Sequence, residues 1–101
     1  PLSTRMGLRN LFRRDKGDPE AERRAALLRA GRIADGSILD VGTDEGGNVT
    51  HVFYTYDFNG VEYESSQMLD AEQLARREDY FAGAHCTVRF DPRHPANSVV
   101  V

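Results

Sequence analysis

Three histidines and one cysteine are the residues whose chemistry would suit a metal site or a nucleophile. They are His51, His85, Cys86 and His94. His85 and Cys86 are adjacent, so on a strand they face opposite sides and cannot hold one metal ion together. The closely spaced ligand pairs of a zinc site are also missing from the sequence. We therefore expect no metal and no other cofactor.

Cys86 could also act as a nucleophile, which requires a nearby base and a lowered thiol pKa. It alternates with Val88 and Phe90, a pattern that places all three on the inner face of a strand. We therefore predict a buried Cys86, with Thr87 and Arg89 pointing outward. No paired acid and base stands out elsewhere, so we predict no catalytic residue, which favours a protein that is not an enzyme.

Three tyrosines and Phe58 lie within residues 54–63, and aromatic side chains on a sheet can stack on nucleobases. Such surfaces carry Lys or Arg between the rings. Here the neighbours are Asp57, Glu62 and Glu64, whose charges would repel phosphate. Core packing explains these rings better, and we expect no nucleic-acid partner.

Charge divides the chain into two parts. Residues 1–16 carry five basic residues and one acidic residue, a net charge of +4, whereas residues 17–101 carry eight arginines and fifteen carboxylates, a net charge of −7. In a helix the apolar side chains of the basic part share one face. This segment could bind an anionic membrane surface, or it could be a solvated start with no binding role. The candidate surface-binding arm consists of Leu8, Arg9, Leu11, Phe12, Arg13 and Arg14.

The length of 101 residues suits one small domain. We expect a basic, flexible segment over residues 1–17 and a single β-rich domain over residues 18–101. The apolar runs are too short to span a bilayer. We therefore expect a cytoplasmic protein that can lie at the periphery of the inner membrane.

The first element predicted in the domain is a helix that Asp18 caps and Gly31 ends, with Ala21, Ala25 and Leu28 on one face. A strand over residues 33–40 follows, in which Gly36 is a candidate for a bulge or bend.

The clearest strand covers residues 49–58, and its inner face carries Val52, Tyr54 and Tyr56. Asn59-Gly60 is the pair that a two-residue type I′ turn prefers. The turn would pair Tyr56 with Tyr63 on the next strand. A hairpin with aromatic residues paired on one face predicts a sheet with a core on that side.

A second helix is predicted from the cap Asp70 to Gly83, with Gln73 completing a capping box and with Leu74, Glu78 and Phe81 at helical spacing. A strand over residues 86–90, a break at residues 91–95 and a last strand follow, and Asp91 can form a tight Asx turn there. The predicted fold class is α+β, mainly β: a small antiparallel sheet curled into a barrel or half-barrel with one or two short helices.

The end of the chain resembles a known bacterial family. Gly83, Val88, Phe90, the Asp91-Pro92 pair and Pro95 follow its closing pattern, and the tyrosine pair with the turn glycine at residues 54–63 is similar to its central block. Residues 28–38 resemble its first strand and the approach to it. Over roughly residues 28–101 the chain resembles the domain of unknown function 3592 (DUF3592). Cys86 and Phe90 stand where the family usually has valine and tyrosine.

The resemblance implies a small β-rich domain, often flanked by membrane helices, with no established activity or catalytic residues. Two hypotheses remain open. The first is a non-enzymatic interaction or scaffold module whose partner is a protein or an anionic membrane surface. The second is a small-ligand-binding or hydrolytic domain whose site is not visible in the sequence.

Overall fold

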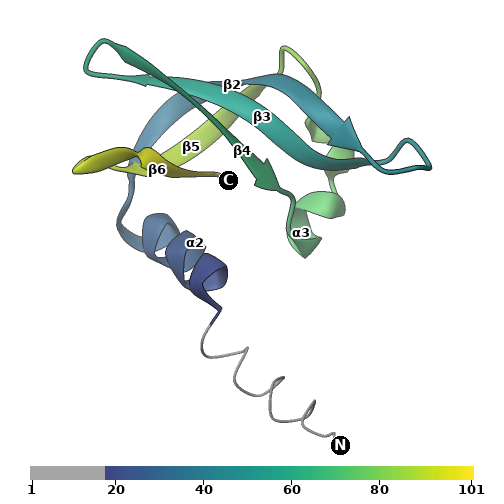
Figure 1. Ribbon diagram of the computed structural model, residues 1–101, viewed down its shortest axis with the longest axis horizontal. Helices are drawn as coiled ribbons and strands as arrows, with labels where there is room; N and C mark the ends of the chain where they lie inside the picture. Colours follow the sequence, from purple (N-terminus) through teal and green to yellow (C-terminus); the bar gives the residue numbers. More distant parts are fainter. Residues whose placement is uncertain (1–17) are drawn as a thin grey trace, which may run out of the picture.

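The computed structural model describes residues 18–101. Its five strands form one antiparallel sheet in the order β4-β3-β2-β5-β6 (Figure 1). The elements in chain order are α2 (Pro19–Ala30), β2 (Arg32–Thr43), β3 (Val49–Phe58), β4 (Val61–Met68), α3 (Ala71–Leu74), the 3-10 turn η1 (Arg77–Asp79), β5 (His85–Asp91) and β6 (His94–Val100). The sheet curls until its edge strands β4 and β6 approach each other. This confirms the mainly β class and the small curled sheet with short helices.

The β3–β4 hairpin has the predicted register. Asn59 and Gly60 both have positive φ, 54° and 78°, as a type I′ turn requires. Tyr56 pairs with Tyr63, and their rings stack with centroids 5.5 Å apart. The turn therefore fixes which side chains of both strands face inward.

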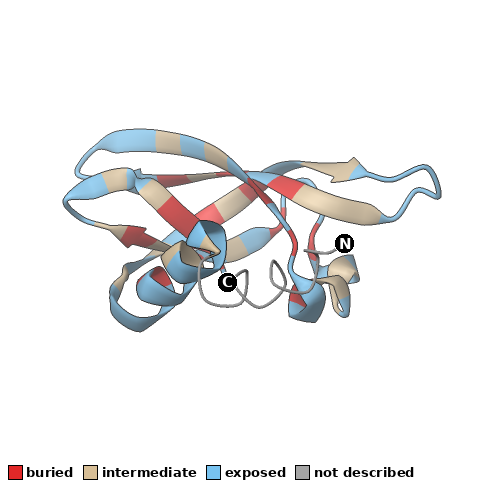
Figure 2. Ribbon diagram, turned by 60° about the horizontal axis from the view of Figure 1, so that its bottom comes forward, coloured by how far each residue is buried: buried red, intermediate tan, exposed pale blue. Residues whose placement is uncertain are grey.

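The core fills the inside of the curled sheet. Val52, Tyr54 and Tyr56 are all buried there, as predicted, and Figure 2 shows buried positions concentrated on the strands. On β5, Val88 and Phe90 are buried and Thr87 is exposed. Further buried members are Ile38, Leu69, Tyr80, Ala84 and Val100. Cys86 packs against this cluster but is only half-buried, so its predicted burial is confirmed in part.

The second predicted helix is much shorter than expected. Asp70 and Gln73 form the predicted capping box, but α3 ends at Leu74. Arg77 donates a hydrogen bond from Nε to the Leu74 carbonyl, which satisfies an acceptor at the helix end. Tyr80 is buried and Phe81 is exposed, so the helical spacing that included Phe81 was wrong. The chain leaves the helix early because Tyr80 must enter the core.

The first helix forms where predicted but uses a different face. Asp18 accepts hydrogen bonds from the amides of Glu20 and Ala21, and the helix ends before Gly31. Leu27 is buried to 5% exposure, whereas Leu28 remains 46% exposed, which corrects the predicted apolar stripe.

The bulge or bend expected at Gly36 does not form there. Gly36 keeps continuous register with both neighbouring strands, and the β2–β3 register shifts lie between Ile38 and Asp40 and between Gly42 and Thr43. A Cβ on Gly36 would lie 2.8 Å from a Val88 methyl carbon, so the glycine allows close packing of the inner layer.

The break predicted at residues 91–95 is only a two-residue turn. Asp91 and His94 are paired, and β6 begins at His94. The Asp91 carboxylate accepts a hydrogen bond of 2.9 Å from the Arg93 amide, which confirms the Asx turn. Pro95 is tolerated because β6 is an edge strand.

The predicted surface-binding arm at residues 8–14 lies outside the described residues. Within residues 18–101, no helix has the length and apolar content to cross a membrane.

Candidate functional site

The gap between the edge strands β4 and β6 is bridged by a side chain. Gln67 donates from Nε2 to the Val100 carbonyl at 3.2 Å and accepts from the Val100 amide at Oε1 at 3.0 Å. Gln67 and Val100 are both buried. The side-chain amide therefore supplies the pair of hydrogen bonds that a neighbouring strand would give, and it closes the sheet at this point.

A second glutamine reaches the same carbonyl from α3. Gln73 donates from Nε2 to the Val100 oxygen at 3.0 Å. Its own position is fixed by the capping box. The backbone amide of Gln73 donates to Asp70 Oδ1 at 2.9 Å, and the backbone amide of Asp70 donates to Gln73 Oε1 at 3.0 Å. The cap therefore positions a side chain that helps to hold the last strand.

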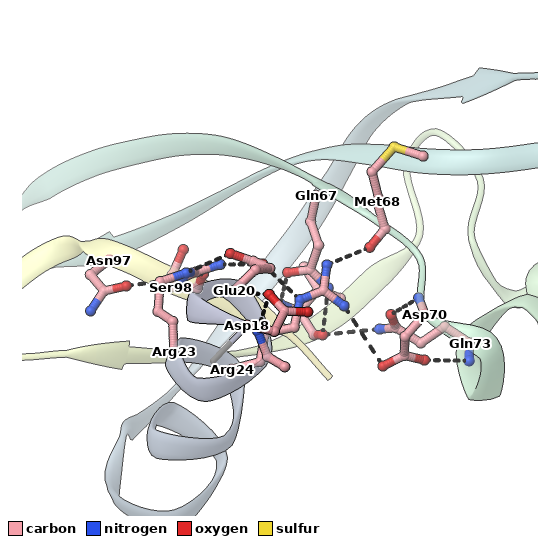
Figure 3. Close-up of polar contacts among 12 residues, drawn as sticks. Asp18, Glu20, Arg23, Arg24, Gln67, Met68, Asp70, Gln73, Asn97 and Ser98 are labelled. Carbon is pink, nitrogen blue, oxygen red and sulfur yellow. Dashed lines mark hydrogen bonds and ion pairs between the residues drawn. The ribbon is translucent and has the colours of Figure 1, made fainter. Parts of the chain in front are cut away.

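Helix α2 is attached to both edge strands by two arginines. Arg23 donates from Nη1 to Asn97 Oδ1 at 2.9 Å and to the Ser98 carbonyl at 2.8 Å, both on β6. Arg24 donates from Nη2 to the Met68 carbonyl at the end of β4, at 2.7 Å. Figure 3 shows these guanidinium groups between the helix and the two strands.

Glu20 holds both arginines in place. Its carboxylate accepts hydrogen bonds from Arg23 at 2.9 and 3.1 Å and from Arg24 at 2.8 Å. The Arg23 bonds, followed by those of Arg24, lower the pKa of Glu20 from 4.5 to about 2, although partial burial acts in the opposite direction. The carboxylate is thus ionised throughout the neutral range.

We call Glu20, Arg23, Arg24, Gln67 and Gln73 the clasp. Its polar atoms bind one another, backbone groups, or the side chains of Asn97 and Asp70, so it is a structural device that fastens α2 and the two strand edges. The helical face predicted from the sequence contains Ala21, Ala25 and Leu28 and leaves out both Arg23 and Arg24. The spacing of Glu20 three and four residues before them was the available signal for a linked group.

Exposed apolar side chains gather on the outer face of the sheet, opposite the core. Phe53 is 40% exposed and Met68 is 59% exposed. Met68 is paired with His51, whose ring lies 5.1 Å from that of Phe53 in an edge-on arrangement. Leu39, the extra residue of the β2–β3 register shift opposite Phe53, is also exposed. We call Leu39, His51, Phe53 and Met68 the outer patch.

The outer patch is built on a tight cross-strand contact. Gly42 on β2 is paired with His51, and a Cβ on Gly42 would lie 1.8 Å from Cε1 of the imidazole. Thr50 lies beside the same ring, with its hydroxyl 3.2 Å from Nδ1. The missing side chain of Gly42 therefore lets the His51 ring lie flat across β2.

The strands that carry the outer patch are acidic. Residues 32–68 contain one arginine and seven carboxylates. None of these carboxylates belongs to an ion pair within residues 18–101, where the ion pairs involve only residues of α2 and residues 70–79, and one of them joins Arg24 to Asp70. Asp40 is the paired neighbour of Phe53, and Glu64 lies on the same outer face of β4 two residues from Ser66. An apolar patch with an acidic surround suits a basic amphipathic ligand.

Residues 29–101 match the family described as domain of unknown function (DUF3592). The chain belongs to the DUF3592 family. This confirms the resemblance expected over residues 28–101. No curated protein and no solved structure shows a significant match to the chain. The outer patch and both clasp glutamines lie inside the matched range, and Glu20, Arg23 and Arg24 precede it.

The residues that first suggested chemistry are separated in the DUF3592 fold. His51 lies on β3, His85 begins β5 and His94 begins β6. Within the described part of the chain, no three His, Cys, Asp or Glu side chains come together as metal ligands. Burial raises the pKa of the Cys86 thiol to about 11, which disfavours the nucleophilic thiolate.

Two of the open hollows beside α2 in the described residues bear on a binding role. One, of about 610 Å³, lies between the helix and the β5–β6 turn and is lined by Arg23, Asp91, Arg93 and Asn97 among others. The other, of about 340 Å³, joins the start of α2 to the outer patch, because Glu20 and Arg24 line it together with His51, Ser66 and Met68.

Proposed function

We propose that this DUF3592 domain is a non-enzymatic interaction module that binds a basic amphipathic segment of a protein through its outer patch. The observation that carries the proposal is the exposure of Phe53, Met68 and Leu39 together on an acidic three-strand face. The apolar side chains would supply burial, and the surrounding carboxylates would select a positively charged ligand.

The packed interior of the sheet supports the proposal that a ligand binds on the outer face. Its core is filled by aromatic and aliphatic side chains, and Tyr54 is hydrogen-bonded to Ser98 at 2.7 Å. The clasp covers the gap between the edge strands with groups that satisfy one another. A ligand therefore meets the outer patch without opening the fold.

The proposal is tested with two labelled synthetic peptides of the same amphipathic pattern, one of leucine and arginine and one of leucine and glutamate. The chain used carries Leu8→Ser, Leu11→Ser and Phe12→Ser, so that its own basic segment has no apolar face. We expect fluorescence anisotropy to show binding of the arginine peptide alone. Raising the salt concentration should weaken this binding, because exposed charges are screened.

The matched variants are Phe53→Ser on the outer patch and Val61→Ser, which removes an exposed apolar side chain at the other end of β4. Phe53→Ser should weaken peptide binding about tenfold, the equivalent of ~1.4 kcal/mol, and Val61→Ser should have little effect. Equal binding of both peptides, or equal loss in both variants, would contradict the proposal.

The membrane contact expected from the basic segment is kept as part of this proposal, with the segment as the membrane-binding element and the outer patch as the protein-binding one. It is supported by the charge of +4 on residues 1–16 and by the apolar trio Leu8, Leu11 and Phe12. A location at the periphery of the inner membrane follows from it.

A second candidate, small-ligand binding, is favoured by the hollow of about 610 Å³, a volume within the usual range for ligand sites. Arg23 and Arg93 line it, so an anionic ligand is the expected class. Titration with inorganic phosphate and citrate, followed by NMR, tests this candidate. Saturable shifts at Arg93 that Arg93→Gln abolishes would support it, and the absence of shifts would remove it.

A further inference from the structure

The N-terminal end of the described residues, where α2 begins, lies near the outer patch. Helix α2 begins at Pro19, and its Glu20 lines the same hollow as His51, Ser66 and Met68. Figure 3 shows the Met68 side chain directed away from the clasp, on the outer side of β4. The start of α2 therefore lies beside the hollow that leads to the outer patch.

The preceding sequence has the chemistry that this surface selects. In a helix, Leu8, Leu11 and Phe12 would share one face, and Arg9, Arg13 and Arg14 would lie largely on the other. Their net positive charge complements residues 32–68, with one arginine against seven carboxylates. The only residues between this segment and Asp18 are Asp15, Lys16 and Gly17.

The short connection determines what the segment can reach. Three residues span at most about 11 Å when extended, so the connection holds the segment near the start of α2, which lies beside the hollow that His51 and Met68 also line. A seven-residue helix is also about 10 Å long, which matches a patch that covers two residues along β3 and its neighbours on β2 and β4. So short a connection gives an effective concentration in the millimolar range, at which a weak contact is well populated.

We propose that residues 8–14 dock on the outer patch of the same molecule, with Leu8, Leu11 and Phe12 against Phe53 and Met68 and with the arginines beside Asp40 and Glu64. This inference rests on the proposed function and names the first occupant of that surface. The docked segment is an autoinhibitory contact, because an external partner must displace it. The same contact hides the apolar trio that a membrane would bury.

The sequence provides a clean probe for docking, because the chain contains no tryptophan. In the full-length Phe12→Trp variant we expect blue-shifted emission and reduced quenching by acrylamide. Adding Phe53→Ser or Met68→Ser should return both signals to those of a free peptide of residues 6–16 that carries the same tryptophan. Val61→Ser is the matched control and should leave them unchanged. The protection should not depend on protein concentration, and high salt should reduce it.

Three results would overturn the inference. An introduced tryptophan as accessible as in the free peptide would show that no docking occurs. Protection that survives both patch variants would place the segment elsewhere, and protection that grows with protein concentration would assign it to a second copy of the chain.

The failure of docking and the failure of the interaction function give different results. An exposed tryptophan in the Phe12→Trp variant, combined with arginine-peptide binding at the outer patch, would refute docking and leave the interaction function intact. A docked tryptophan with no binding of any added peptide to the chain with the three serine substitutions would refute the interaction function alone.

Discussion

His51 lies across Gly42, its paired residue on the neighbouring strand, so closely that a Cβ on the glycine would come within 1.8 Å of the imidazole ring. The ring also meets Phe53 edge-on at 5.1 Å. The absence of a side chain at Gly42 therefore supports the orientation of two residues of the outer patch. A ring that covers a glycine on the neighbouring strand is a known way of stabilising a strand pair.

Gly42→Ala should destabilise the fold by about 1–2 kcal/mol, because the His51 ring must leave its place. The same substitution in a His51→Ala background should cost much less. Urea unfolding of the two single variants and the double variant measures the coupling. An equal loss in both backgrounds would mean that the steric contact does not set the requirement for glycine.

Gln67→Leu should reduce the free energy of unfolding by about 1–3 kcal/mol, because it keeps the side-chain volume but leaves the buried Val100 amide without an acceptor. The Val100 carbonyl keeps its bond from Gln73. Hydrogen exchange at the Val100 amide should become faster. The control is Ser66→Ala at the exposed neighbouring position, which should change neither quantity. Unchanged exchange at Val100 would show that other contacts hold the edge strands β4 and β6 together.

The features that the sequence predicted correctly depend on local rules. The Asn59-Gly60 turn fixes the β3–β4 register, and the alternation at Val52, Tyr54 and Tyr56 then assigns the inner face. These signals span only a few residues. For the same reason the caps at Asp18 and Asp70 appeared where expected.

The features that escaped prediction depend on distant partners. Gln67 binds a residue 33 positions away, and no local pattern marks a glutamine as the link between two edge strands. The length of α3 could not be predicted either, because the burial of Tyr80 overrides a helical spacing that Phe81 matched by chance. The outer patch was missed because alternation only assigns residues to the inner or the outer face of a strand. Phe53 follows the same alternation as any other outward residue, and the pattern does not show which outward residues of different strands lie together.

Glu20 makes stability depend on acid pH. Its pKa is about 2 in the folded protein and 4.5 ordinarily, because Arg23 and Arg24 bind its ionised form. The contribution is therefore present above pH 4.5 and is lost as the pH falls toward 2. Glu20→Gln should show a smaller drop in Tm between pH 5 and pH 2.5. The corresponding difference in the free energy of unfolding should stay below about 1 kcal/mol, since the side chain is half exposed.

The matched control for this experiment is Glu22→Gln, on the same helix but outside the clasp. It should keep the acid sensitivity of the unchanged chain. If both variants lose the same sensitivity, the effect belongs to the net charge of α2 and not to the pairing of Glu20.

Cys86 should react slowly with iodoacetamide in the native protein. Burial raises the pKa of its thiol from 9.0 to about 11, so the thiolate fraction near pH 8 falls about a hundredfold relative to the ordinary value. The reaction rate in the native chain should be at least about a hundredfold lower than in the urea-unfolded chain. Equal rates in the two states would contradict the contact of Cys86 with the core.

Anionic vesicles provide the last test, that of residues 8–14 as a membrane-binding arm. The full chain should co-sediment with vesicles that contain phosphatidylserine, and the variant Leu8→Ser, Leu11→Ser, Phe12→Ser should not. Each basic residue near the surface contributes on the order of 1 kcal/mol, and salt should weaken the binding. Since docking on the outer patch would compete with lipid, Phe53→Ser should raise vesicle binding above that of the unchanged chain, and Val61→Ser should not. If the serine variant binds as well as the full chain, or if salt has no effect, residues 8–14 are not a membrane arm.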